Sequence, residues 1–231
     1  METRPKTHTV REKAYNYVKD LILSNQLQSG QKLNQERIAN QLHISRTPIR
    51  EALHRLRSEG LVTTSGAGGF RVYRLSLEEL EELFDIRSML EGYLIRSACK
   101  NIPDAEIERL SEYIRGSENA IQNRNSDEIY KYNTKFHDTF QHYSRNKHRT
   151  NNIIANMKEH MLKYRKNTLY YLDIAKRTIA GHKKIILALQ TRDPDLCEYM
   201  MRKHIMDAKD NAIRITFGNR DNLSKMEKVL E

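Results

Sequence analysis

Hydrophobic positions recur every three to four residues over most of the chain, which is the spacing of an amphipathic helix. Near the start, this period predicts a helix that follows residue 9 and ends near Leu27. Its apolar positions are Ala14, Tyr17, Val18, Leu21 and Ile22. Beyond residue 75 the same period predicts helices at about 77–100, 104–123, 126–144, 147–170, 173–191 and 194–217, and no strand. The expected fold class is therefore mainly α.

Between residues 33 and 62, two short helical segments are separated by a tight turn, as in a helix-turn-helix. The positions spaced to close its core are Ile38, Leu42, Ile44, Ile49, Leu53, Leu56 and Leu61. Ser45 is a suitable N-cap for the second helix, and Pro48 falls in its first turn, where no helical bond is lost. At about 100° per residue, the arc beside the apolar one holds Arg46, Arg50, His54 and Arg57. This basic arc predicts an anionic partner.

Two alternating segments follow, LVTT and GFRVYRL, on either side of a glycine-rich tip at residues 65–68. Alternation predicts short strands, and the glycines suit the turn of a hairpin. We therefore assign residues 1–75 to one domain. The pattern Ser76-x-x-Glu79 forms a capping box, which predicts that an all-helical second domain begins there and occupies residues 76–218. Residues 219–231 are predicted to be a polar tail.

The segment SRTPIREALHRLRSEGLV closely resembles the recognition helix of the GntR family of bacterial transcription regulators. The resemblance implies a winged helix-turn-helix that binds double-stranded DNA. One recognition helix buries too little surface for tight specific binding alone, so we expect a dimer on a short palindromic operator. Position by position, it implies DNA contacts from Arg37, Ser45, Arg46, Thr47, Arg50 and Gly66, with Ser45 and Thr47 at phosphates. The alternative is a solvated basic face on a structural helix bundle.

The helical second domain resembles the FCD ligand-binding domain of the FadR branch, in its six-helix (VanR-like) form. That likeness implies a homodimer and a cavity for a small carboxylate effector, often held through a metal. The metal pattern of the family matches Asn133, His137, His182 and His204. Asn133 stands where an aspartate is more usual, and a neutral amide is a poorer cation ligand. Three imidazoles and an amide favour Zn or Ni over Mg or Ca.

Spacing supports this histidine set. Asn133 and His137 are four residues apart, so both point the same way from one helix. His182 and His204 are equidistant from a turn around Asp193, so they lie at the same height if their helices form an antiparallel hairpin. The alternative for each histidine is a core side chain that has found a hydrogen-bond partner.

Arg87 lies by angular position within the apolar stripe of the predicted helix 77–100. A buried guanidinium must be paired or hydrogen-bonded. One possibility is an internal pair with Glu91, four residues later. The other is a carboxylate of the effector, which a guanidinium binds through two parallel hydrogen bonds. Arg165, on another apolar stripe, is a second candidate for contact with the effector.

Charge and composition limit the classes of function. The net charge is +10, and residues 1–75 hold 13 Lys and Arg against 6 Asp and Glu, while the remainder holds 27 against 24. The basic excess therefore lies at the helix-turn-helix end, whereas non-specific nucleic-acid binding would predict basic residues spread along the chain. No apolar run approaches the roughly 18 residues of a membrane span, and no signal-peptide core is present, so we expect a cytoplasmic protein.

A competing class is a metal-dependent enzyme acting on a small carboxylate, because histidines in a cavity can hold a metal that activates water. The histidines here lack an acid at motif spacing, such as the glutamate of H-E-x-x-H, so no enzyme is expected. Cys99 and Cys197 follow no metal or redox spacing and are predicted to be small core residues.

Overall fold

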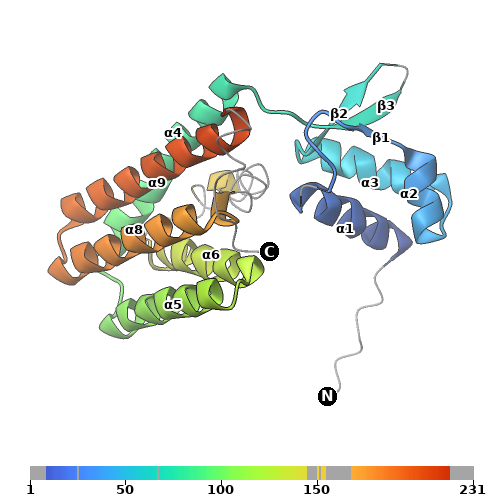
Figure 1. The fold of residues 1–231 in the computed structure, drawn as a ribbon. Coiled ribbons are helices and arrows are strands. Elements are labelled where there is room, and N and C mark those ends of the chain that lie inside the picture. The colour runs from blue at the N-terminus through green and yellow to red at the C-terminus, as the bar shows by residue number, and fades with distance from the viewer. Residues whose placement is uncertain are drawn as a thin grey trace. The chain divides into compact units, whose positions relative to one another are not determined.

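The computed structural model of the chain describes residues 9–24, 26–66, 68–144, 150, 152–154 and 168–218. These residues form two compact units, one through Arg74 and one from Leu75 onward. Both units are built mostly of helices, and the described part of the chain contains one small sheet (Figure 1). The mainly α fold class is confirmed. The helix expected at 147–170 and the tail 219–231 lie almost wholly outside the described residues.

The first unit contains the helices α1 (Val10–Leu23), α2 (Gln35–Leu42) and α3 (Arg46–Ser58). Thr9 begins α1 with a capping box, in which its hydroxyl accepts the Glu12 N–H and the Glu12 carboxylate accepts the Thr9 N–H. The helix ends four residues before the predicted Leu27. The chain turns back after the helix, and the Leu27 N–H donates to the Leu21 carbonyl at 2.9 Å, so Leu27 does not continue the helix.

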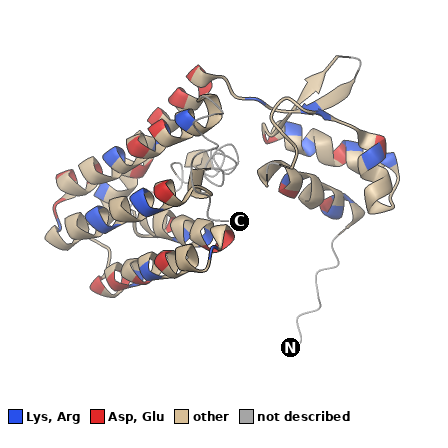
Figure 2. Ribbon diagram, viewed as in Figure 1, with Lys and Arg blue, Asp and Glu red and all other residues tan. Residues whose placement is uncertain are grey.

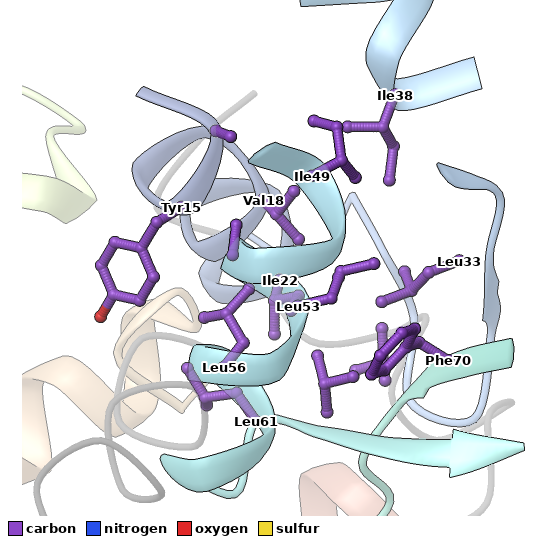
Figure 3. Packing of buried hydrophobic residues seen from close by; sticks show 14 of the residues in the cluster. Tyr15, Val18, Ile22, Leu33, Ile38, Ile49, Leu53, Leu56, Leu61 and Phe70 are labelled. Atoms are coloured by element: carbon purple, nitrogen blue, oxygen red, sulfur yellow. The ribbon is translucent and has the colours of Figure 1, made fainter. Parts of the chain in front are cut away.

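The core of this unit lies between α1, α3 and the sheet (Figure 3). Of the positions predicted for it, Ile38, Ile49, Leu53, Leu56 and Leu61 are buried, and Leu42 and Ile44 pack against it while partly exposed. On α1 the buried tyrosine is Tyr15 rather than the predicted Tyr17, which is only partly buried.

Tyr15 can be buried because its polar tip and its ring both find partners. Its hydroxyl donates to Glu59 Oε2 at 2.7 Å. The guanidinium of Arg55 lies 3.8 Å from the ring centroid, within the range of a cation–π contact. Lys19 Nζ donates to the same hydroxyl at 2.9 Å. This cluster joins α1 to the C-terminal end of α3.

The sheet has three antiparallel strands in the order β1-β3-β2. The predicted hairpin is present as β2 (Val62–Ser65) and β3 (Gly69–Val72), with Ser65 opposite Gly69. Gly68 in its tip has φ +76°, a conformation that favours glycine. β1 (Lys32–Leu33) was not predicted, because two residues are too short to show alternation.

The second unit contains the described helices α4 (Leu77–Ala98), α5 (Asp104–Gln122), α6 (Ser126–Tyr143), α8 (Leu172–Thr191) and α9 (Pro194–Phe217). Their ends lie within two residues of the predicted ones. The predicted capping box begins α4: Glu79 N–H donates to the Ser76 hydroxyl (3.1 Å), and Ser76 N–H donates to the Glu79 carboxylate (2.7 Å).

Within this unit α4 packs along α9, α8 packs against α9, and α5 packs against α6 and α8 (Figure 1). Cys99 and Cys197 are fully buried as predicted, with their Sγ atoms 3.4 Å apart where the end of α4 meets the first turn of α9. None of the helices in the described ranges is long and apolar enough to cross a membrane.

Candidate functional site

The first candidate site is the exposed side of α3. The apolar side of this helix, including Ile49 and Leu53, is buried in the core. The other sides carry several exposed arginines, seen as blue segments along α3 in Figure 2. All six residues expected at DNA are exposed: Arg37, Ser45, Arg46, Thr47, Arg50 and Gly66.

Three of these six residues surround one hollow of about 380 Å³. Arg46, Thr47 and Arg50 line it from α3, and Gly68 lines it from the tip of the hairpin. Gln35, the first residue of α2, completes the lining and was not predicted from the sequence. Its position directly after the N-cap Asn34 and two residues before Arg37 is the signal that would have indicated it. Arg37 lies in a neighbouring hollow, and Ser45 and Gly66 line neither.

Ser45 occupies the N-cap of α3, as predicted, but its hydroxyl makes no capping bond there. By contrast, Asn34 at the start of α2 accepts the Arg37 N–H at 3.0 Å. The backbone donors in the first turn of a helix have no partner within the helix. Together with an uncommitted hydroxyl and the positive end of the helix dipole, they suit a phosphate group.

The second candidate site is a cluster of three buried histidines in the second unit. His137 comes from α6, His182 from α8 and His204 from α9. Each offers one ring nitrogen, and these three atoms all lie within 4.8 Å of one another. The fold therefore brings these three histidines together, as their sequence pattern predicts.

Two of the imidazoles face each other through their Nε2 atoms, which lie 3.4 Å apart. Two nitrogens bound to one tetrahedral zinc stand about 3.3–3.4 Å apart, since each Zn–N bond is about 2.0–2.1 Å. The spacing of His137 and His182 thus fits a shared first-row cation. Phe136 stacks on the His182 ring, with centroids 3.9 Å apart and planes 14° from parallel, and this contact holds the ring in place.

His204 approaches α8 at a glycine. A Cβ atom added to Gly181 would lie 2.5 Å from His204 Nδ1, which is too close for any real contact. The absence of a side chain at this position therefore lets the third imidazole enter between α8 and α9.

Asn133, the fourth predicted ligand, is buried on α6 one turn before His137. The other predicted residues of this site have different environments. Arg87 is buried and its Nε donates to Glu91 Oε1 at 2.6 Å, which is the internal pair weighed from the sequence. Arg165 lies outside the described residues.

Sequence reasoning missed the second partner of Glu91. His137 Nδ1 donates to Glu91 Oε2 at 2.5 Å, across 46 residues of chain. The carboxylate therefore joins Arg87 to the histidine cluster. The sequence did show that Glu91 lies one turn after Arg87 on the buried stripe. Spacing along one helix does not show which side chain of a neighbouring helix contacts it.

Two known families match the chain. Residues 10–72 match the bacterial regulatory proteins of the gntR family, and residues 82–207 match the FCD domain. An uncharacterised HTH-type transcriptional regulator of Bacillus subtilis, YdhC, is 27% identical over 218 residues, covering 85% of this chain and 93% of that protein. The Nta operon transcriptional regulator of Aminobacter aminovorans is 28% identical over 200 residues, covering 86% and 92%.

A solved structure, McbR/YncC of E. coli, is similar in fold. It superposes with a TM-score of 0.68 at 23% identity, and the match covers 86% of this chain and 94% of that one.

Proposed function

This chain is a transcription regulator of the GntR family with a C-terminal FCD domain, and from that premise we propose that a small organic acid controls its affinity for a specific operator. In this proposal residues 1–75 bind DNA, and residues 76–218 bind the effector and form the homodimer. Bacterial operators lie in the cytoplasm, which is where we place the protein.

The observation that carries the DNA-binding role is the hollow lined by Arg46, Thr47, Arg50 and Gln35 beside the hairpin tip. Arginine binds guanine edges through two hydrogen bonds, and an amide such as that of glutamine does the same with adenine. We propose that these residues contact bases or phosphates, together with Arg37, Ser45 and Gly66. One recognition helix buries too little surface for tight specific binding, so a homodimer on a palindrome is the expected arrangement.

The effector role rests on the buried histidine cluster. We propose that His137, His182 and His204 hold one divalent cation, with Asn133 as a further ligand. Neutral imidazoles favour Zn or Ni over Mg or Ca. The bound cation would supply a positive charge that attracts a carboxylate. Arg87 and Arg165 are the proposed further contacts of the effector.

The competing interpretation as a metal-dependent enzyme is not supported. The matched families and the relatives are transcription regulators. The carboxylate beside the cluster is that of Glu91, and both of its oxygens are already hydrogen-bonded to other side chains.

The test starts with selection of bound sequences from random DNA duplexes by the full chain. We expect enrichment of one short palindrome, and recovery of no sequence would contradict the proposal. The selected duplex is then titrated with protein in the presence of a panel of short carboxylic acids. One or more acids should change the affinity without being consumed, whereas turnover of an acid would indicate an enzyme. Only an acid with unequal affinity for the two states of the regulator can have this effect.

A further inference from the structure

Three buried side chains form a continuous chain of hydrogen bonds beside the histidine cluster. Arg87 Nε donates to Glu91 Oε1 at 2.6 Å, and His137 Nδ1 donates to Glu91 Oε2 at 2.5 Å. All three residues are at least nine-tenths buried. The two residues of α4 thus present one carboxylate to a histidine of α6.

The bond from His137 decides which ring nitrogen is available to a ligand. A neutral imidazole carries its proton on one nitrogen and its lone pair on the other. A carboxylate can only accept a hydrogen bond, so its contact with Nδ1 favours the tautomer of the neutral ring that has the proton on Nδ1 and the lone pair on Nε2. That is the atom facing His182 Nε2 at 3.4 Å. Glu91 therefore orients His137 toward the other histidines.

Arg87 has a matching role toward Glu91. A buried carboxylate is strongly disfavoured unless it is paired, and the guanidinium of Arg87 supplies the opposite charge at 2.6 Å. Its bond to Oε1 leaves Oε2 directed at His137. Arg87 and Glu91 lie one helical turn apart, so the backbone of α4 sets this geometry.

We propose that Glu91 is a positioning residue of the cation site and that Arg87 holds it in place. This inference rests on the proposed cation site and adds a source of negative charge to it. Asn133 is neutral where an aspartate would bring a charge to the cation directly. Glu91 brings one through His137, since a carboxylate hydrogen-bonded to an imidazole makes its other nitrogen a stronger ligand. Arg87 then already holds Glu91 when no effector is bound, whether or not it also contacts an effector.

The experiment measures Ni²⁺ and Zn²⁺ affinity by calorimetry on the full chain after chelator treatment and dialysis. Glu91→Gln keeps the shape of the side chain but removes its charge, and we expect it to weaken cation binding by about 10–100-fold. Arg87→Met should also weaken cation binding, even when no carboxylate effector is present. An Arg87 that contacts only the effector would leave this affinity unchanged.

Removing one partner of a buried pair can unfold a domain, so a double variant accompanies the single ones. Arg87→Met with Glu91→Leu replaces both charges by apolar groups, a change that buried ion pairs tolerate far better than loss of one partner. Its affinity should fall at least as far as that of Glu91→Gln. Nitrogen-15 spectra of its imidazoles should show that His137 no longer holds its proton mainly on Nδ1.

The matched control is the Arg109–Glu106 pair on α5, which has the same 2.6 Å length but is more exposed and lies outside the cluster. Arg109→Met and Glu106→Gln should bind the cations like the parent. Parent-like affinity in Glu91→Gln and in the folded double variant would overturn the role of Glu91 while leaving the cation site intact. A parent that binds neither Ni²⁺ nor Zn²⁺ would refute the cation site itself, and this inference with it.

Discussion

Arg46 and Arg50 are exposed on α3 and line the same hollow, away from the hydrophobic core. Changing either to alanine should weaken binding to the selected operator by about 1–3 kcal/mol if each reads a base edge. The melting temperature should stay within error of the parent, because neither side chain packs in the core. Fluorescence anisotropy with a labelled duplex, combined with thermal unfolding, measures both quantities.

Arg55 provides a control on the same helix with the opposite expectation. Its guanidinium stacks on the Tyr15 ring and pairs with Glu59 at 3.2 Å, so it serves the fold of the unit. Arg55→Ala should lower the melting temperature while the folded protein keeps its operator affinity. Equal operator affinities for Arg46→Ala, Arg50→Ala and the parent would show that the recognition face was assigned wrongly.

For single residues, helical spacing predicts well which side chains are buried. It does not predict which side chains of other elements they contact. The burial of Ile49, Leu53 and Leu56 follows from helical spacing and is found in the structure. Tyr15 was missed because the polar partners that allow its burial include Glu59, 44 residues away. Glu91 was taken only as a partner of Arg87 for the same reason, since its contact with His137 depends on how α4 meets α6.

The helix pair α8 and α9 depends on glycine at position 181. Gly181→Ala should displace the His204 ring, because the added Cβ would lie 2.5 Å from Nδ1. The better helix propensity of alanine, about 1 kcal/mol, opposes an overpacking cost of about 1–3 kcal/mol. We therefore expect a small loss of stability and a clear loss of Ni²⁺ affinity in calorimetry.

Gly116→Ala is the comparison for that change. Its added Cβ would lie 2.5 Å from the ring of Tyr132, so it disturbs the packing of α5 against α6. It should lower stability without weakening the cation site. Loss of Ni²⁺ affinity in both variants, or in neither, would contradict a specific role of the glycine beside His204.

The contact between α1 and α3 should be sensitive to alkali. Burial is the main cause that raises the pKa of Tyr15 above its ordinary value, and the Glu59 carboxylate adds to it, although Lys19 opposes the shift. Because the protonated phenol is favoured in the fold, its contribution is fully present below the unfolded pKa of about 10 and is lost as the pH rises through the folded pKa.

Tyr15→Phe should therefore reduce the stability of the first unit by about 0.5–1.5 kcal/mol near pH 8, the usual contribution of one hydrogen bond. Above pH 10 the difference between variant and parent should shrink. Urea unfolding of both proteins between pH 8 and 11 gives this comparison. A gap that widens with pH would contradict the assigned sign.

Among elements, the five described helices of the second unit were predicted to within two residues because their apolar period persists over many turns. The capping box formed by Ser76 and Glu79 allowed the start of α4 to be predicted from the sequence. β1 could not be predicted, since it consists of two residues and exists only because Lys32 and Leu33 pair with Arg71 and Phe70. Its existence depends on tertiary pairing.

For the whole molecule, chelation is the simplest test of the cation. An ion that binds only the folded form stabilises it by about 2.7 kcal/mol at a hundredfold excess over its dissociation constant. Treatment with a chelator should thus lower the melting temperature, and added Zn or Ni should restore it. Asn133→Asp should increase the effect by placing a negative charge at the cation.

Elemental analysis after purification without chelators provides the independent check. We expect a stoichiometric first-row metal in the parent. No metal in that analysis, with no thermal shift on adding Zn or Ni, would leave the histidines as hydrogen-bonding side chains of the pocket. From sequence, the histidines were expected because they match the metal pattern of the FCD family. Spacing supported that match, since His182 and His204 are equidistant from the turn between α8 and α9.

The wide separation of these histidines along the chain has a kinetic consequence. His137 and His182 are 45 residues apart and come from helices that must both be docked before their Nε2 atoms meet. Contacts that close such long loops tend to form late in folding. An interaction absent from the transition state slows unfolding and leaves the folding rate almost unchanged. A cation held by this cluster would therefore set how long the folded second unit persists, and not how quickly it forms.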